Sequence, residues 1–227
     1  EIEYLRSCYP GLSHLYIEDE TIGQNKKLWD KLLPELKKTG LRYSSNFRIG
    51  VAGNDFLEGM RDANFRKVNM GVESGNEWLR KNVLKRHYSN EQIIAAYRHA
   101  KKLGMKTKSY NLIGLPHETP EMFEDTIRVN RIIRPDETAL NIFFPYPGTE
   151  LDRLCDEMGV KPKEADVPIR ERTQSILDLP DFPRNKIMAY FEAWGLMMRF
   201  GRVGYYVRPL KQLKQAMLRK RHQSSSQ

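Results

Sequence analysis

Hydrophobic and polar positions along this chain alternate between two kinds of segment. Short apolar runs of strand character are each followed by a stretch in which apolar residues recur at helical spacing. Strands followed by helices, with the strands buried on both faces, are typical of a parallel sheet. The pattern therefore predicts an α/β fold, either a barrel or an arc of one. The five predicted strands are residues 13–17, 41–49, 68–72, 106–113 and 138–144.

The helix that is best marked lies between residues 89 and 104. Ser89 and Gln92 form a capping box at its start, and Gly104 supplies the stop signal. Thr119 caps the next helix, in which Pro120 takes the first position. Further helices are expected at residues 24–38, where Pro34 should introduce a kink, and at 55–63, 77–84 and 149–158.

The pattern changes after residue 160. Residues 161–183 are irregular and rich in proline, residues 185–200 predict a helix, and residues 210–221 predict a basic helix or tail. We therefore expect two parts: a partial barrel at residues 1–160, and a helical extension with a basic tail at residues 161–227.

Charge and composition limit the binding partners and the cellular location that we expect. Of the formal net charge of +9, eight Lys and Arg residues lie between positions 199 and 221 without any Asp or Glu, so the remainder is nearly neutral. The basic segment predicts, as one reading, contact with RNA or an anionic surface through residues 208–221. Two cysteines provide no disulfide framework, and no apolar run is long enough for a membrane span, so we expect a cytoplasmic protein.

Chemistry is concentrated where the predicted strands end. Carboxylates, hydroxyls and glycines follow four strands, at residues 17–19, 73–75, 113–118 and 144–149. Ligands of parallel α/β proteins bind at these carboxyl ends, so the four segments are expected to form the rim of one barrel.

The order of these motifs resembles the radical S-adenosylmethionine (SAM) superfamily, and most closely its cobalamin-binding branch. The resemblance covers residues 1–160 without a break. The segments that carry it are Tyr-Ile-Glu-Asp-Glu-Thr at 16–21, Phe-Arg-Ile at 47–49, Met-Gly-Val-Glu-Ser-Gly-Asn at 70–76, Asn-Leu-Ile-Gly-Leu-Pro-His-Glu-Thr at 111–119, and Phe-Pro-Tyr-Pro-Gly-Thr at 144–149.

This resemblance implies a partial (β/α)6 barrel that contains strands 2–6 of the family and lacks its first strand. It implies a small-molecule substrate and an enzyme that generates a 5′-deoxyadenosyl radical from SAM, or methylates its substrate with cobalamin. No catalytic residue is implied. The implied SAM-binding residues are Glu18 and Asp19 for the amino group, Arg48 for the carboxylate, Glu73, Ser74 and Gly75 on the ribose side, Asn111, Gly114 and Pro116 along the adenine, and Asn141, Pro145 and Tyr146 at the edge of the pocket.

The sequence departs from the family at the iron–sulfur cluster. The family holds a [4Fe–4S] cluster on a C-x3-C-x2-C segment, whereas the cysteines here are Cys8 and Cys155, 147 positions apart. We therefore expect a C-terminal fragment whose cluster ligands and cobalamin domain are not in this chain, and which is inactive by itself. The histidines show no metal-ligand spacing, so no metal ligand is predicted.

Other interpretations stay open at this point. Glu18 and Asp19, or Glu73 and Ser74, could simply cap helices, and Arg48 could be a surface residue. His117 is expected to be solvated. The protein could instead be a relative of the RNA-modifying methylthiotransferases, or a barrel without catalysis that binds a nucleoside or a partner.

Overall fold

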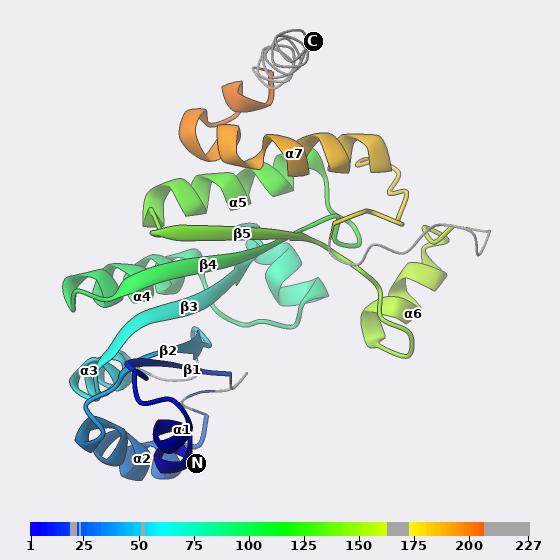
Figure 1. Ribbon diagram of the computed structural model, residues 1–227. Coiled ribbons are helices and arrows are strands. Elements are labelled where there is room, and N and C mark those ends of the chain that lie inside the picture. Colours follow the sequence, from blue (N-terminus) through cyan, green and yellow to red (C-terminus); the bar gives the residue numbers. More distant parts are fainter. Residues whose placement is uncertain (19–21, 23, 51–52, 163–172, 207–227) are drawn as a thin grey trace, which may run out of the picture. The chain divides into compact units, whose positions relative to one another are not determined.

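The structure, a computed structural model, describes all residues except 19–21, 23, 51–52, 163–172 and 207–227, and it leaves the side chain of Asn54 undescribed. Five strands form one sheet in the order β1-β2-β3-β4-β5, and the pairs β1/β2, β2/β3 and β3/β4 are parallel (Figure 1). The expected α/β fold with a parallel sheet is confirmed. The strands are β1 (His14–Ile17), β2 (Arg42–Phe47), β3 (Phe65–Glu73), β4 (Lys106–Ile113) and β5 (Glu137–Ile142).

Helices precede or follow these strands nearly where the apolar spacing places them. Ser89 and Gln92 make both hydrogen bonds of the predicted capping box at the start of α4. Pro34 lies inside α2, which continues through it without a break in the assigned helix. The α-helices are α1 (Ile2–Cys8), α2 (Lys26–Lys38), α3 (Asn54–Asp62), α4 (Asn90–Lys102), α5 (Pro120–Ile133), α6 (Glu150–Glu157) and α7 (Arg184–Phe200).

The helix predicted at residues 77–84 differs from the structure, which has a five-residue π-helix there, Leu79–Val83. The Arg80 side chain is fully buried and donates through Nε and Nη2 to the Tyr88 carbonyl at 3.0 and 2.9 Å, and through Nη1 to Asn90 Oδ1 at 2.8 Å. A buried guanidinium must satisfy its donors, and these bonds tie the widened turn to the segment ahead of α4. The spacing of apolar residues in the sequence gives no indication of these hydrogen bonds.

Contacts group the chain into two compact units, each described here by itself. Unit 1 comprises residues 1–73, 80–111 and 132–139, and unit 2 comprises residues 74–79, 112–131 and 140–227. This grouping follows contact density and does not test the predicted boundary at residue 160, which stays a prediction.

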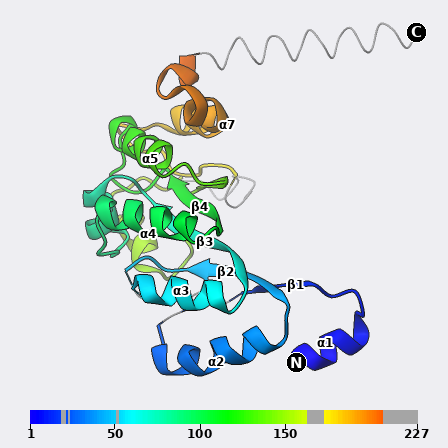
Figure 2. The ribbon, with the colours of Figure 1, turned by 90° about the vertical axis from the view of Figure 1, so that its left-hand side faces the viewer.

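In unit 1 one face of the sheet is apolar and covered by helices. The Tyr43 and Phe65 rings lie 5.2 Å apart, and Phe47 stacks on Phe56 of α3 at 6.2 Å. The α3 helix contacts both β3 and α4, as Figure 2 shows. On α4, the Tyr97 hydroxyl donates to the Met70 carbonyl at 2.7 Å, which anchors the helix to β3. This face is the core of unit 1.

The other face of the sheet in unit 1 is polar. Strand register places Tyr16, Ser44, Lys67 and Lys106 in one row, and Asn46, Asn69 and Lys108 in another. Tyr16 is 44% exposed and Lys67 and Lys108 are half-buried. The expectation that the strands are buried on both faces holds at Ser44 and Asn69 of this face, which are buried, and fails at Tyr16.

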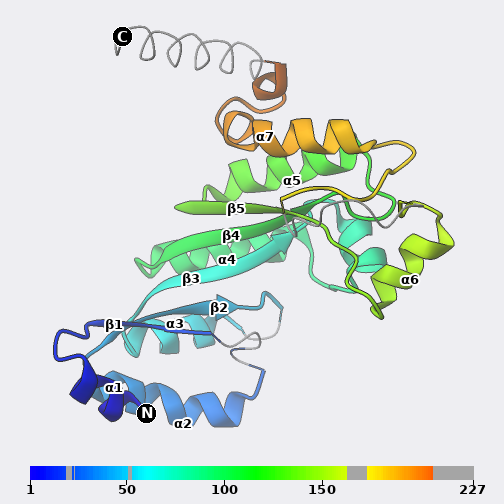
Figure 3. The ribbon, with the colours of Figure 1, turned by 45° about the vertical axis from the view of Figure 1, so that its right-hand side comes forward.

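In unit 2, helices α5 and α7 lie side by side (Figure 3). The Phe123 ring packs against Tyr190 at 5.8 Å and Trp194 at 6.0 Å, between ring centroids. Trp194 and Met197 are buried as core residues, whereas Phe200 is 47% exposed. Within the described part of the chain, no helix is both long and apolar enough to cross a membrane.

Candidate ligand-binding site

A pocket of about 320 Å³ lies in unit 1 where β2 and β3 end. Two of the residues expected at the site, Arg48 and Glu73, line it together. Arg48 is exposed and follows the last residue of β2, and Glu73 is the last residue of β3. The described residues that line it are Asn46, Phe47, Arg48, Ile49, Asn69, Gly71, Glu73, Arg86 and Tyr110.

Glu73 has an unusual local geometry that turns its side chain back along the strand. Its φ is 62°, and the pairing of β3 with β4 shifts register between Gly71 and Glu73. A Cβ on Gly71 would lie 2.2 Å from Glu73 Oε1, so only glycine leaves room for the carboxylate there. Positive φ is costly for a residue with a Cβ and is typical of functional sites.

The electrostatics around Glu73 are set by burial and one cation. Its side chain is 16% exposed, and Arg86 Nη2 lies 3.5 Å from its Oε1. Burial raises the pKa of Glu73 above its usual value of 4.5, and Arg86 counteracts part of that rise. The pocket thus presents two guanidinium groups, Arg48 and Arg86, and one buried carboxyl.

Tyr88 stabilises the backbone at Gly71, which lines the pocket. Its hydroxyl donates to the Gly71 carbonyl at 2.9 Å, and the guanidinium of Arg80 lies 5.2 Å from its ring centroid. Burial raises the pKa of Tyr88 to about 12, so the phenol remains a neutral donor at ordinary pH. The backbone of Gly71 is therefore held in place beneath the Glu73 carboxyl.

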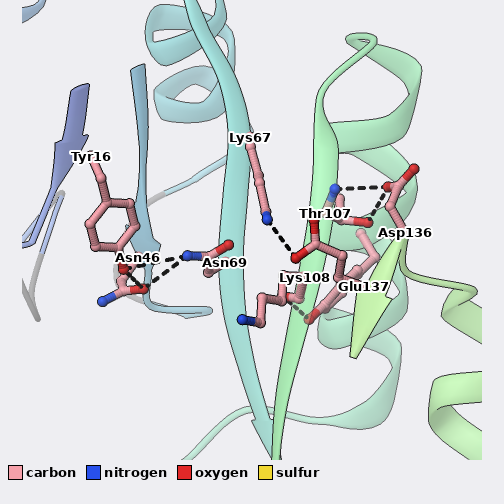
Figure 4. Close-up of polar contacts among 9 residues, drawn as sticks. Tyr16, Asn46, Lys67, Asn69, Thr107, Lys108, Asp136 and Glu137 are labelled. Carbon is pink, nitrogen blue, oxygen red and sulfur yellow. Dashed lines mark hydrogen bonds and ion pairs between the residues drawn. The ribbon is translucent and has the colours of Figure 1, made fainter. Parts of the chain in front are cut away.

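Three polar side chains form a hydrogen-bonded group beside the pocket (Figure 4). The Tyr16 hydroxyl donates to Asn46 Oδ1 at 2.7 Å, and Asn69 Nδ2 donates to Asn46 Oδ1 at 3.3 Å and to the Tyr16 hydroxyl at 3.4 Å. Asn69 is 5% exposed, and its Oδ1 atom has no hydrogen-bond partner in the part of the chain that the structure describes.

The sequence reasoning missed Asn46, Asn69, Arg86 and Tyr110. A signal for one of them, Asn69, was present, because polar residues alternate with apolar ones at positions 67–70, which read Lys-Val-Asn-Met. The strand was instead interpreted from its apolar members. No local signal identifies Arg86, since the turn ahead of α4 brings it to Glu73.

Two other expected residues of unit 1, Glu18 and Asn111, are not among the described residues of this lining. Glu18 is exposed, and Asp19 lies outside the described residues. Asn111 is fully buried, and its Nδ2 donates to Ser109 Oγ at 3.1 Å and to the Ala139 carbonyl at 3.0 Å. These bonds give Asn111 a role in holding strands together.

In unit 2, Ser74 and Gly75 make close contacts within the fold. Ser74 is buried, and its Oγ accepts from the Asn76 amide at 3.2 Å. The Gly75 amide donates to Thr126 Oγ1 at 2.8 Å, and a Cβ on Gly75 would lie 2.3 Å from the Asp125 carbonyl oxygen. Gly75 therefore allows the backbone to approach α5.

The segment that follows β4 is a turn closed by a buried carboxyl. Glu118 is 1% exposed, and its Oε2 accepts from the amides of Gly114 at 2.6 Å and Leu115 at 3.3 Å. Burial raises the pKa of Glu118 to about 8, against the lowering effect of the two amides. Pro116 is buried in the turn, and His117 is exposed, as expected.

The three expected residues at the edge of the pocket also belong to unit 2. Asn141, on β5, is half-buried, and Pro145 is buried in the loop that follows. Tyr146 is 42% exposed, and its ring lies 5.2 Å from that of Phe144. Their assignment to a ligand stays a prediction.

The residues present do not fit an iron–sulfur cluster. Cys8 is exposed, Cys155 is buried, and burial raises the pKa of the Cys155 thiol to about 11, which disfavours the thiolate that iron requires. Among the described residues no group of three or more His, Cys, Asp or Glu side chains could hold a metal ion. An iron–sulfur cluster of this family requires three cysteine thiolates, and these 227 residues contain only two cysteines.

The family is identified by comparison with known proteins. Residues 11–129, more than half of the chain, match the model of the radical SAM superfamily, and the chain belongs to this superfamily. An uncharacterized methyltransferase of Pyrococcus horikoshii is 28% identical over 147 residues, which are 62% of this chain and 31% of the relative. A tRNA-2-methylthio-N(6)-dimethylallyladenosine synthase of Anoxybacillus flavithermus is 27% identical over 99 residues, which are 43% of this chain and 19% of that relative.

Solved structures confirm the fold class. Coproporphyrinogen III oxidase of Escherichia coli, a radical SAM enzyme, matches with a TM-score of 0.60 and 22% identity, over 80% of this chain and 39% of that one. The radical SAM methyltransferase TsrM of Kitasatospora setae, solved with cobalamin and a [4Fe–4S] cluster, matches with a TM-score of 0.56 and 19% identity, over 64% of this chain and 29% of that one. The chain thus spans less than half the length of each of these proteins.

Proposed function

We propose that this chain is the SAM-binding part of a radical SAM enzyme, and that the pocket at the ends of β2 and β3 holds the SAM. The observation that carries the proposal is the meeting of Arg48, Glu73 and Arg86 around a pocket of about 320 Å³ in a chain of this superfamily. Clefts of this size bind small molecules, and ligands of parallel α/β folds bind at strand ends.

The charges of the pocket complement those of SAM. Guanidinium groups bind carboxylates through paired hydrogen bonds, so Arg48 is suited to the carboxylate of the methionyl group. Glu73 is held over Gly71 with its carboxyl lining the pocket, where it can accept from ribose hydroxyls. Bound SAM would supply the source of a 5′-deoxyadenosyl radical or of a methyl group. The residues of this chain would orient it and limit its contact with water.

A methyltransferase that uses cobalamin is the reaction we propose within this superfamily. Support comes from the methyltransferase of Pyrococcus horikoshii and from TsrM, whose structure contains cobalamin. In a form of the protein that includes a three-cysteine cluster site, reconstituted anaerobically and reduced, we expect 5′-deoxyadenosine or S-adenosylhomocysteine to form from SAM. If neither product forms, the proposed reaction is wrong.

Titration of the 227-residue chain with SAM in a calorimeter tests the binding proposal directly. Replacing Arg48 by Ala should weaken binding about tenfold or more, because a hydrogen bond to a charged group contributes roughly 1.5–3 kcal/mol. Arg42→Ala is the matched control. Arg42 is an exposed arginine at the other end of β2, outside the pocket lining, and its removal should change affinity less than about twofold. Absence of binding to the unaltered chain, or equal losses in both variants, would overturn the proposal.

A second candidate is a methylthiotransferase relative that acts on RNA, favoured by the likeness to the tRNA-modifying synthase of Anoxybacillus flavithermus. The basic residues 208–221 that would contact RNA lie outside the described residues. Deleting residues 208–227 should then abolish most RNA binding in a filter assay and reduce the salt dependence of the binding that remains. Unchanged binding would remove this candidate.

A further inference from the structure

The polar face of the sheet in unit 1 has a composition that sheet packing does not explain. We define the polar strand face as Tyr16, Ser44, Asn46, Lys67, Asn69, Lys106 and Lys108, which occupy two register rows of β1–β4. No aliphatic side chain belongs to these rows. Figure 4 labels Tyr16, Asn46, Lys67, Asn69 and Lys108 of this face, together with Glu137 beside it.

The face carries an excess of positive charge. Lys67 Nζ pairs with Glu137 Oε2 at 2.6 Å, and the ammonium of Lys108 lies 5.0 Å from the ring centroid of Tyr110. Lys67, Lys108 and Lys106 all lower the pKa of Glu137, with the hydrogen bond from Lys67 as the largest cause. The three ammonium groups act together on the Glu137 carboxylate, and they would attract an anionic group of a ligand in the same way.

Asn69 supplies the independent observation that a ligand belongs here. Asn69 is 5% exposed and lines the pocket, and its Nδ2 donates to Asn46 and Tyr16, while its Oδ1 has no hydrogen-bond partner among the described residues. An unsatisfied buried polar atom costs about 1–3 kcal/mol, so its presence in the free protein requires an explanation. Exchanging the amide oxygen and nitrogen of Asn69 does not remove the problem, because an atom on the same side then remains unsatisfied.

Ser45, which precedes Asn46, is a useful comparison because it has an unpartnered buried atom and lines neither described pocket. Ser45 is fully buried, and its Oγ also has no partner among the residues that the structure describes, but its register row belongs to the face covered by helices, together with Val68. Neither described pocket includes Ser45 in its lining. The two residues thus differ in that Asn69 lines a pocket and Ser45 does not.

We propose that the polar strand face is a substrate subsite that takes a hydrophilic acid bearing a hydroxyl or N–H donor. The donor group binds Asn69 Oδ1, which Tyr16 and Asn46 orient, and the acidic group binds among the lysines. The inference rests on the proposed function, since Asn46 and Asn69 also line the pocket assigned to SAM. A substrate on this face would therefore lie beside the SAM, as group transfer requires.

The probes that test this are malate and succinate, which carry the same two carboxylates and differ by one hydroxyl. Saturation-transfer difference NMR detects such weak ligands, and the full 227-residue chain is used with each acid separately. We expect malate to receive at least about threefold more saturation than succinate. In Asn69→Leu this preference should disappear, whereas Lys108→Met should reduce the signals of both acids by a similar factor.

Ser45→Ala is the matched control, because it removes a buried, unpartnered atom from the other face and should leave the malate preference unchanged. Tyr16→Phe guards against a folding failure of Asn69→Leu. It alters an exposed residue, and by loosening the Asn46–Asn69 pair it should lower the malate preference about twofold.

Two results would overturn the subsite: equal saturation of both acids in the unaltered chain, or an Asn69→Leu variant that keeps the preference. Calorimetry with SAM keeps this outcome separate from that of the proposed function. If SAM binds and the acids show no preference, the subsite alone fails. If SAM does not bind and malate is preferred, the proposed function fails.

Discussion

Glu73 and Glu118 are both buried carboxyls that follow the apolar run of a strand, but they have different surroundings and different roles in the structure. In unit 1, Glu73 lines a pocket, lies 3.5 Å from Arg86, and retains 16% of its side-chain exposure. In unit 2, Glu118 is closed off and accepts from two backbone amides of its own turn. Burial raises the pKa of both.

This difference shows how a structural carboxyl at the end of a strand can be distinguished from one that binds a ligand. A carboxyl that accepts from local backbone amides stabilises a turn, as Glu118 does through Oε2. A carboxyl that is turned over a glycine into a pocket, with a cation beside it, remains available to a ligand. Sequence position alone does not separate the two cases.

The largest expected effect concerns Glu118 and pH. Its folded pKa of about 8 lies above its usual value of 4.5, so between these values the folded state binds a proton that the unfolded state releases. Stability should therefore fall as pH rises through this window, by about 1.4 kcal/mol for each pH unit. Urea unfolding at pH 5 and pH 8 measures the change, and in Glu118→Gln most of it should vanish. A Glu118→Gln variant with the same pH dependence as the unaltered chain would contradict this assignment.

The next effect separates the glycines of the two strand ends. Gly75→Ala should reduce the free energy of unfolding by about 3 kcal/mol, because the new Cβ would meet the backbone of Asp125 and Thr126, which cannot move aside. Gly71→Ala should cost less stability, since its neighbour is the flexible side chain of Glu73. Chemical denaturation of both variants compares them, and the reverse order would be inconsistent with these contacts.

The smallest effect concerns Glu73 and SAM. Glu73→Gln should weaken SAM about tenfold in calorimetry, equivalent to about 1.4 kcal/mol, with little change in stability. Because the pKa of Glu73 is raised above 4.5, affinity should increase with pH as the carboxyl ionises, and this increase should be absent in the variant. Glu35→Gln, an exposed carboxylate paired with Lys38, serves as the control. Equal losses in both variants would exclude a specific role for Glu73.

Local signals predicted most elements of the fold well. The capping box at Ser89 and the proline at the start of α5 are local devices, and the structure contains both helices. Residues 106–113 form β4 as predicted. The π-helix at Leu79–Val83 was not predictable in this way, since it depends on Arg80 reaching Tyr88, a partner eight residues away.

The candidate site was predictable only in part. Arg48 and Glu73 could be expected at strand ends, and the pocket includes both. Asn69 and Arg86 were missed because their significance depends on register and on a turn. The reverse holds for Ser74, Gly75 and Asn111, whose described contacts are structural and whose assignment to SAM stays a prediction.

The sequence by itself determined the succession of strands and helices, the family, and the absence of a three-cysteine cluster site among these 227 residues. These properties depend on residue types, periodicity and caps, which act over a few positions. Only the tertiary structure decided which polar atoms are buried without a partner and which carboxyl faces a pocket. Burial and strand register bring together residues that lie far apart in the chain. The raised pKa of Glu73 and the unpartnered oxygen of Asn69 arise only in that folded arrangement.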